Sequence, residues 1–177
     1  LLEFAIKYCE AFGMSEMQTN QFLRGEKIAI PDTSALLKNV QLIEELNKEY
    51  SKVIIPDVVV DELDHIKNKN SGVLGRKAWE ILRGISYGDR IILSKYCGSG
   101  SISADCKIIA IAKQISEEYH CKVDIITEDT DYSAYLKGHE TVIAVHLREY
   151  VATKQELVNM TKLTKINQCF LKSYECC

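Results

Sequence analysis

The 177-residue sequence is 46% hydrophobic and 27% charged, proportions that indicate one globular domain and exclude a disordered or fibrous chain. The net charge of −3 argues against a protein that coats nucleic acid or anionic lipid through bulk positive charge, so any nucleic acid must be bound locally. The seven cysteines include no CxxC pair and are odd in number, which favours reduced thiols over disulfides or a zinc site and predicts a cytoplasmic protein, with the nucleus as the alternative.

The hydrophobic pattern predicts helices that alternate with short apolar strands along the whole chain. The pattern contains no internal repeat. It predicts strands over 28–32, 52–56, 123–127 and 141–145 and a short apolar run at 91–93. It predicts helices over 1–12, 34–50, 57–67, 76–86, 105–119 and 131–137, a loop over 68–75 and a helical tail over 153–171. In this tail Thr153 and Glu156 are spaced as a capping box.

This alternation predicts an α/β fold with three α/β/α layers, in which helices cover both faces of a central parallel sheet. The predicted domain spans residues 27–150, with a helical extension over 1–26 and a helical tail over 151–177. In open parallel sheets the functional site lies beyond the carboxyl ends of the strands. The residues that follow the predicted strands are therefore the first candidates for a site.

Acidic residues follow three of the predicted strands. On a helical wheel Glu62 falls within the apolar arc of its helix, and Asp105 falls within the apolar arc of the helix over 105–119. Burying an unpaired carboxylate costs several kcal/mol, so such an acid is neutralised, paired with a cation or bound to a metal. The alternatives are a buried ion pair for Glu62 and a favourable helix-dipole position for Asp105. The acids after the strands are Asp32, Asp57, Asp61, Glu62, Glu128, Asp129 and Asp131.

Hard oxygen ligands without histidine or cysteine suit Mg²⁺ or Mn²⁺ and not zinc. Divalent ions held by carboxylates promote phosphodiester cleavage, so phosphoryl chemistry is the predicted activity. The sequence lacks the D-x-D of haloacid dehalogenase phosphatases, the paired acids of receiver domains and the glycine-rich phosphate loops of nucleotide-binding proteins.

Four segments, in this order and at these elements, resemble the PIN domain family of metal-dependent ribonucleases. They are Ile30-Pro-Asp32-Thr-Ser-Ala-Leu36, Ile55-Pro-Asp-Val-Val-Val-Asp-Glu62-Leu63, Asp105-Cys-Lys-Ile-Ile-Ala-Ile-Ala112 and Ile126-Thr127-Glu-Asp129-Thr-Asp131. The resemblance covers about Lys27 to Tyr150. The segment from Asp105 to Tyr150 is most similar to PIN domains fused to PhoH-type ATPases. The predicted terminal helices are absent from the small toxin nucleases and favour a module of a larger RNA-processing protein.

The resemblance implies a carboxylate site that holds one or two Mg²⁺ or Mn²⁺ ions. Its ligands would be Asp32, Glu62, Asp105 and Asp129, with Asp131 as the alternative or supplement to Asp129. The hydroxyl of Ser34 would orient Asp32, and that of Thr127 would steady the fourth acidic loop. The implied activity is endonucleolytic hydrolysis of single-stranded RNA by metal-activated water, and the alternative is a catalytically weak scaffold that binds RNA or docks proteins.

Basic residues near the acids are candidates for holding RNA phosphates, although each is equally well explained as a solvated surface residue. Tyr132 and Tyr135 lie beside the acidic loop, where core packing is the favoured role and base stacking the alternative. The basic candidates are Lys38, Lys67, Lys69, Arg76, Lys77 and Lys107.

The apolar runs are shorter than the roughly 18 to 20 residues of a membrane helix, so no membrane partner is expected. The start of the chain lacks the basic flank and the cleavage site of a signal peptide. Because the chain opens with Leu1 and not with Met, we expect further domains of a longer chain or a processed product, and a homo-oligomer is the other expected partner.

Overall fold

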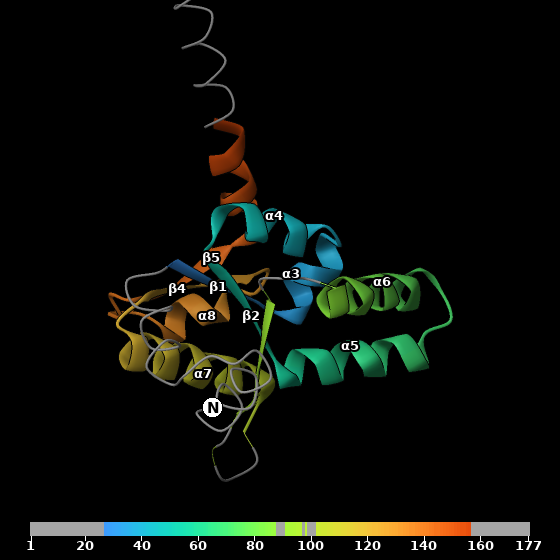
Figure 1. Ribbon diagram of the computed structural model, residues 1–177, viewed down its shortest axis with the longest axis horizontal. Helices are drawn as coiled ribbons and strands as arrows, with labels where there is room; N and C mark the ends of the chain where they lie inside the picture. Colours follow the sequence, from blue (N-terminus) through green and yellow to red (C-terminus); the bar gives the residue numbers. More distant parts are fainter. Residues whose placement is uncertain (1–26, 88–90, 97, 99–101, 157–177) are drawn as a thin grey trace, which may run out of the picture.

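The computed structural model describes residues 27–87, 91–96, 98 and 102–156 (Figure 1). The predicted N-terminal helix and most of the predicted tail lie outside the described residues. Within them, no helix is long and apolar enough to cross a membrane.

A five-stranded sheet forms the centre of the fold, and all of its neighbouring strands are parallel. The strand order is β3-β2-β1-β4-β5, with β1 and β4 adjacent to each other inside the sheet. The inner strands β1 and β4 are buried after their first residue, as expected for strands covered on both faces. The strands are β1 (Lys27–Pro31), β2 (Lys52–Pro56), β3 (Ile91–Ser94), β4 (Lys122–Thr127) and β5 (Val142–His146).

Helices cover both faces of the sheet, which confirms the predicted three-layer α/β/α architecture. α4 and the helix over residues 147–156 lie on one face, and α5 and α7 lie on the other (Figure 1). α5 and α6 pack against each other as a pair that projects beyond the sheet. The helices are α3 (Thr33–Lys38), α4 (Leu42–Glu49), α5 (Asp57–Lys69), α6 (Val73–Tyr87), α7 (Ala104–Tyr119), α8 (Asp131–Tyr135) and the unlabelled helix over 147–156.

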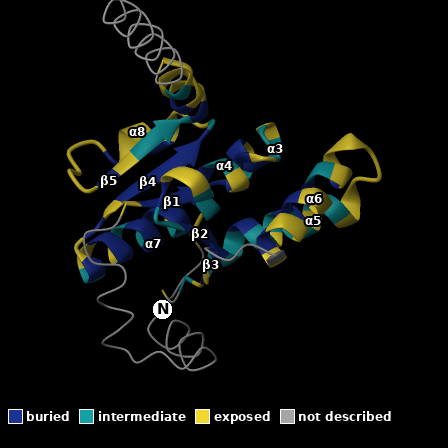
Figure 2. Ribbon diagram, turned by 45° about the horizontal axis from the view of Figure 1, so that its top comes forward, coloured by how far each residue is buried: buried dark blue, intermediate teal, exposed yellow. Residues whose placement is uncertain are grey.

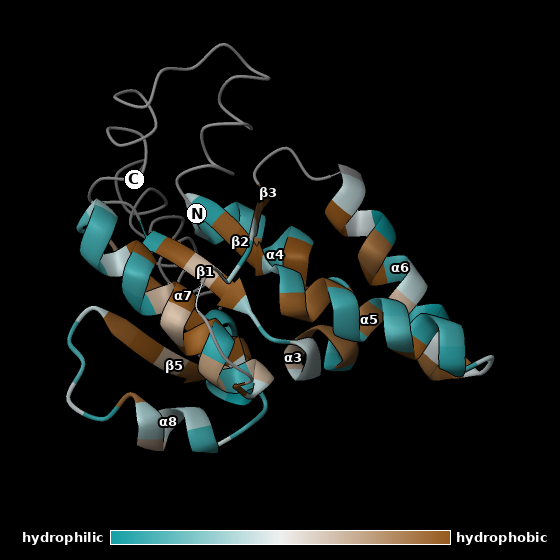
Figure 3. Ribbon diagram, turned by 90° about the horizontal axis from the view of Figure 1, so that it is seen from below, coloured by the Kyte–Doolittle hydropathy of each residue, from teal (hydrophilic) through white to brown (hydrophobic). Residues whose placement is uncertain are grey.

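One buried apolar cluster includes residues of all five strands and of the helices packed on them. Figure 2 shows β1 and β4 as buried and the edge strand β5 as partly exposed, whereas the helices expose one side. Figure 3 shows hydrophobic strands and helices whose hydrophobic and hydrophilic residues alternate along the chain. Burial of these apolar faces is the main favourable contribution to folding.

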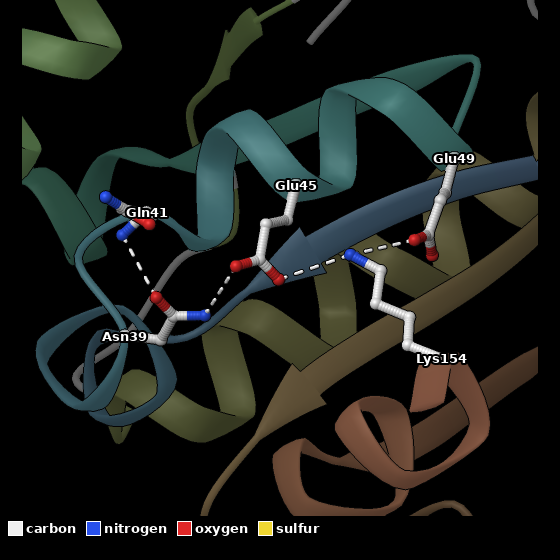
Figure 4. A network of polar contacts seen from close by, with 5 residues as sticks. All are labelled: Asn39, Gln41, Glu45, Glu49 and Lys154. Carbon is white, nitrogen blue, oxygen red and sulfur yellow. Dashed lines mark hydrogen bonds and ion pairs between the residues drawn. The ribbon is translucent and has the colours of Figure 1, made fainter. Parts of the chain in front are cut away.

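The predicted single helix over 34–50 is wrong, because the chain forms two helices there. Asn39 ends α3 in an extended conformation, with φ −130° and ψ 98°. Its Oδ1 accepts a hydrogen bond from the backbone N of Gln41 at 3.1 Å, and its Nδ2 donates to Glu45 Oε1 at 3.3 Å (Figure 4). An asparagine side chain that bonds the backbone in this way competes with a continuous helix.

The predicted loop over 68–75 is confirmed only at residues 70–72, because α5 continues to Lys69 and α6 begins at Val73. Gly75, which suggested a loop, instead lies inside α6 where two backbones meet. A Cβ at this position would lie 1.7 Å from the carbonyl oxygen of Asn70. Glycine is needed here because α6 passes close to the backbone of Asn70, the residue that caps the end of α5, and not for a turn.

The C-terminal helix begins at residue 147, so the predicted start at residue 153 is wrong. Thr153 lies inside this helix and its Oγ1 donates to the carbonyl oxygen of Glu149 at 2.9 Å, so it is not the N-cap of a capping box. Lys154 links the helix to α4 through two ion pairs, in which its Nζ lies 2.8 Å from Glu49 Oε1 and 3.2 Å from Glu45 Oε2 (Figure 4). The helix crosses residue 150, and the domain limits remain a prediction.

Candidate metal centre

The candidate site lies where the chain leaves two adjacent strands in opposite directions. From β1 the chain continues to β2 on one side, and from β4 it continues to β5 on the other. Such a divergence opens a crevice beyond the carboxyl ends of the strands, where ligands bind in α/β sheets. Asp32 follows β1 directly, and its backbone N donates to the carbonyl oxygen of Ile126 in β4 at 3.0 Å.

The four carboxylates predicted from the sequence line one hollow of about 270 Å³ at this crevice. They come from four different parts of the chain: the N-cap of α3, the middle of α5, the first turn of α7 and the loop after β4. No basic side chain is among the described residues that line the hollow. The lining residues are Asp32, Thr33, Ser34, Leu37, Glu62, Asp105, Ile108, Asp129 and Tyr132.

Asp32 is the most firmly held of the four carboxylates. Its Oδ1 accepts hydrogen bonds from the backbone N of Ala35 at 2.7 Å and from Ser34 Oγ at 2.9 Å, and its Oδ2 accepts one from Thr127 Oγ1 at 2.5 Å. Both hydroxyls that the sequence analysis selected therefore contact Asp32. Burial raises the pKa of Asp32 above its ordinary value, the three hydrogen bonds lower it in part, and the negative charge of Asp105 raises it further.

Glu62 and Asp105 each accept a hydrogen bond from a hydroxyl for which the sequence predicted no such role. Thr33 Oγ1 donates to Glu62 Oε2 at 2.5 Å, and Tyr132 OH donates to Asp105 Oδ1 at 2.9 Å. Two positions in the sequence could have indicated these donors: Thr33 is next to Asp32, and Tyr132 follows the acidic loop. Burial, the bond to Asp105 and the surrounding negative charges raise the pKa of Tyr132, so its hydroxyl keeps its proton and remains a donor.

The two alternative explanations have different outcomes. Among the described residues Glu62 has no ion-pair partner, so the buried ion pair is not found. Asp105 does lie in the first turn of α7, where the helix dipole favours a negative charge. By contrast, the carboxylate of Asp124 is buried in the sheet but paired, at 2.9 Å from Lys27 Nζ and 2.7 Å from the hydroxyl of Tyr50. The carboxylates that line the hollow thus differ from Asp124, because no cation among the described lining residues pairs with them.

The acidic loop after β4 turns back on itself through short-range bonds. The backbone N of Asp129 donates to Thr127 Oγ1 at 2.9 Å, and the backbone N of Asp131 donates to Asp129 Oδ1 at 2.9 Å. Asp131 is exposed at the start of α8 and does not line the hollow. The structure therefore brings Asp129, and not Asp131, to the other three carboxylates.

The predicted phosphate-binding cations do not line the hollow. Lys38 is exposed in the last turn of α3, and Lys107 is half-buried at the start of α7. Arg76 is exposed in α6, and Lys67 pairs with Asp64 on α5 at 2.5 Å. Their role in RNA binding remains a prediction.

The chemistry of the donor set fits a divalent cation. Carboxylate oxygens that share a hollow without a basic neighbour repel one another, and Mg²⁺ or Mn²⁺ prefers such oxygen ligands. In the part of the chain that the structure describes, no three His, Cys, Asp or Glu side chains are gathered closely enough to hold one ion. The carboxylates thus share a hollow without forming a finished ligand set.

The sequence matches one family of known proteins, and it is similar to solved structures at low identity. The PIN domain family matches residues 29–141, a span that contains all four carboxylates of the hollow. The chain is similar to the PIN domain of human SMG5, at 19% identity over 71% of this chain and 98% of that one, with a TM-score of 0.49. It is also similar to a domain of a functionally unknown protein from Methanocaldococcus jannaschii DSM 2661, at 21% identity over 67% and 89% of the two chains and a TM-score of 0.46. No curated protein matches the sequence. The match of the family over most of the chain shows that this protein belongs to the PIN domain family.

Proposed function

We propose that the protein is a divalent-metal-dependent ribonuclease that hydrolyses single-stranded RNA endonucleolytically. PIN domains are generally nucleases, which supports this class of activity. The observation that carries the proposal is the hollow in which four carboxylates from four elements meet without a basic side chain among its described lining residues. The proposed ligands of one or two Mg²⁺ or Mn²⁺ ions are Asp32, Glu62, Asp105 and Asp129.

The chain's own residues would hold the carboxylates in place. Ser34 and Thr127 fix both oxygens of Asp32, while the backbone N of Ala35 ties the same carboxylate to the start of α3. Thr33 donates to one oxygen of Glu62, and Tyr132 donates to one oxygen of Asp105. Neither bond occupies the second oxygen of its carboxylate. A divalent ion bound there would activate water and stabilise the leaving 3′ oxygen of the RNA.

Two of the predicted cations are next in sequence to residues that line the hollow. Lys38 lies one residue from Leu37, and Lys107 lies one residue from Ile108, and both of these apolar residues line the hollow. Phosphate contacts of this kind position a strand without reading its sequence. A PIN domain of this type would therefore cut with little base preference unless another surface adds selectivity.

The test is cleavage of a circular single-stranded RNA with Mn²⁺, Mg²⁺ or EDTA. A circle has no ends, so its linearisation can only be endonucleolytic. Asp32→Asn and Glu62→Gln should abolish metal-dependent cutting, whereas Asp61→Asn should not, because Asp61 is exposed beside Glu62 on α5 and lies outside the hollow. Cutting that survives both hollow substitutions, or the absence of any cutting, would contradict the proposal.

Metal binding by itself separates the enzyme from the alternative of a catalytically weak scaffold. Calorimetric titration with Mn²⁺ should show binding to the wild type and to Asp61→Asn, and at least tenfold weaker binding to Asp32→Asn. Binding of RNA without cutting, and without a measurable affinity for Mn²⁺, would support the scaffold. The relation to PhoH-type ATPases and the place within a larger RNA-processing protein remain predictions.

A further inference from the structure

The α5–α6 pair carries a large aromatic side chain on its outer surface. Trp79 in α6 is 53% exposed, although tryptophan is usually largely buried in folded proteins. It is the only tryptophan of the chain. Packing in the apolar core does not explain why the Trp79 side chain lies at the surface. A contact with a partner at the surface is the explanation that can be tested.

Trp79 borders a hollow between the two helices. The hollow has a volume of about 470 Å³, within the range of pockets that accept small organic groups. The guanidinium carbon of Arg83 lies 5.6 Å from the centre of the Trp79 ring, one helical turn further along α6. Lys67 contributes from α5, so an aromatic face and two cations from two helices meet at one place. The lining residues are Lys67, Trp79, Leu82, Arg83 and Ser86.

The segment that carries this hollow is more basic than the chain as a whole. Residues 64–86 contain five basic and two acidic side chains, whereas the whole chain has a net charge of −3. Arg83 has no acidic partner among the described residues, and its guanidinium lies over the ring of Trp79. Lys67 is paired with Asp64 and retains a partly exposed side chain. An anionic partner is therefore favoured over a neutral or acidic protein surface.

We infer that this hollow is a stacking site for single-stranded RNA, in which a base packs on Trp79 while Arg83 and Lys67 hold the adjoining phosphates. Aromatic rings flanked by cations bind single strands in this way because every base has a π-face. The inference rests on the proposed ribonuclease function and adds a second contact to the same substrate. We name this group of residues, Trp79, Arg83 and Lys67, the stacking site.

The position of the stacking site also favours a single strand over a duplex. Lys67 lies five residues after Glu62 on α5, which corresponds to about 7.5 Å along the helix axis and about 140° around it. An RNA bound at both places must therefore bend around α5. A flexible single strand can follow this path, whereas a duplex is stiff over tens of base pairs.

The fluorescence of Trp79 tests the inference directly, because no other tryptophan contributes to the signal. The full chain is titrated in EDTA with a mixed-sequence single-stranded RNA of about 12 nucleotides, and in parallel with an abasic strand of equal length. EDTA prevents metal-dependent cutting, so the result is independent of catalysis. We expect the RNA to quench the fluorescence at saturation and the abasic strand to have little effect.

Variants measured with a fluorescently labelled RNA provide the second readout. Trp79→Leu should weaken binding by about 5- to 150-fold, while Trp79→Phe, which keeps a ring, should recover most of the affinity. Arg83→Gln should weaken binding by about 2- to 5-fold, and Arg148→Gln, an exposed arginine outside the stacking site, should leave it unchanged.

Four outcomes would overturn the inference. They are the absence of RNA binding, unchanged fluorescence of Trp79 at saturating RNA, equal quenching by the abasic strand, and wild-type affinity of Trp79→Leu. Unchanged fluorescence would leave the surface available to a protein partner instead. Quenching without metal-dependent cleavage would support the stacking site and contradict the ribonuclease, whereas cleavage without quenching would do the reverse.

Discussion

The hydrogen bond from Tyr132 to Asp105 offers a sharp test of the candidate metal centre. Tyr132 is 1% exposed, and its hydroxyl lies 2.9 Å from Asp105 Oδ1. Tyr132→Phe removes this one donor and retains the buried ring. The loss leaves a carboxylate in the hollow with one partner fewer, while the apolar packing of α8 against β5 is kept.

The size of the effect follows from the type of bond. A hydrogen bond to a charged group contributes about 1.5–3 kcal/mol to stability. Loss of a residue that orients a metal ligand typically costs 10- to 100-fold in metal affinity, which corresponds to about 1.4–2.7 kcal/mol. We therefore expect Tyr132→Phe to bind Mn²⁺ about 10- to 100-fold more weakly than the wild type.

The assay is calorimetric titration with Mn²⁺, together with urea unfolding in EDTA. Tyr135→Phe is the matched control, because Tyr135 lies on the same helix but is 60% exposed. Its metal affinity and its free energy of unfolding should stay within about 0.5 kcal/mol of the wild type. In an Asp105→Asn background, Tyr132→Phe should cost much less affinity, because the two residues act through one bond.

One result would refute this reasoning. If Tyr132→Phe folds and binds Mn²⁺ as tightly as the wild type, Asp105 is either not a ligand or is oriented by something other than Tyr132. The Asp105→Asn variant decides between these two explanations, since it loses affinity only if Asp105 is a ligand.

Two further predictions concern stability. In EDTA, Asp32→Asn should raise the free energy of unfolding at neutral pH, because asparagine keeps an acceptor for the N-cap bond and removes a charge whose folded-state pKa is raised by burial and by Asp105. For the same reason, the contribution of Asp32 to wild-type stability is present at low pH and is lost as the pH rises through its folded-state pKa. Urea unfolding between about pH 4 and 8 will measure this loss, and a wild type that is no less stable than Asp32→Asn at the upper end would contradict it. Gly75→Ala should destabilise the protein by about 1–3 kcal/mol, because the added Cβ meets the backbone of Asn70. Gly84→Ala, in open space on the same helix, should instead stabilise it by about 0.5–1 kcal/mol. Equal thermal shifts of the two variants would refute the close approach at Gly75.

The layer architecture was predictable because each buried strand is a short and almost uninterrupted apolar run. Strand β2 spans Lys52–Pro56 as predicted, and β5 (Val142–His146) is displaced by one residue from its prediction. Parallel strands covered on both faces carry this pattern in any sequence of their class. The strand order was not predicted, since pairing between β1 and β4 depends on packing across the whole chain.

The carboxylates were predictable for a related reason, because each acid occupies a position that the local pattern marks. Asp32 follows a strand, while Glu62 and Asp105 interrupt apolar helix faces. Their hydrogen-bond donors were not predictable in this way. Thr33 and Tyr132 lie 29 and 27 residues from the acids that they bind, and a hydroxyl on a single sequence carries no sign of so distant a partner.

The errors in helix boundaries arose at residues whose role depends on tertiary structure. Gly75 is of a residue type common in loops, but it lies inside α6 where the helix passes close to the backbone of Asn70. Asn39 is tolerated inside many helices, yet here its side chain bonds Gln41 and Glu45 and ends α3. Thr153 and Glu156 have the spacing of a cap, although the helix had already begun. In each case the local sequence is compatible with the predicted boundary but does not determine it.

The pairing of β1 with β4 also determines when the hollow can exist during synthesis. Thr127 binds Asp32 across 95 residues of sequence, and the strand pair aligns Lys27 with Lys122. Contacts of such long range close late, because the entropy of the intervening chain must be lost first. A chain emerging from the ribosome therefore carries Asp32 and Glu62 long before it can assemble the complete carboxylate group. The acidic loop after β4 completes the group, so the nascent chain holds only part of the carboxylate set until β4 has paired with β1.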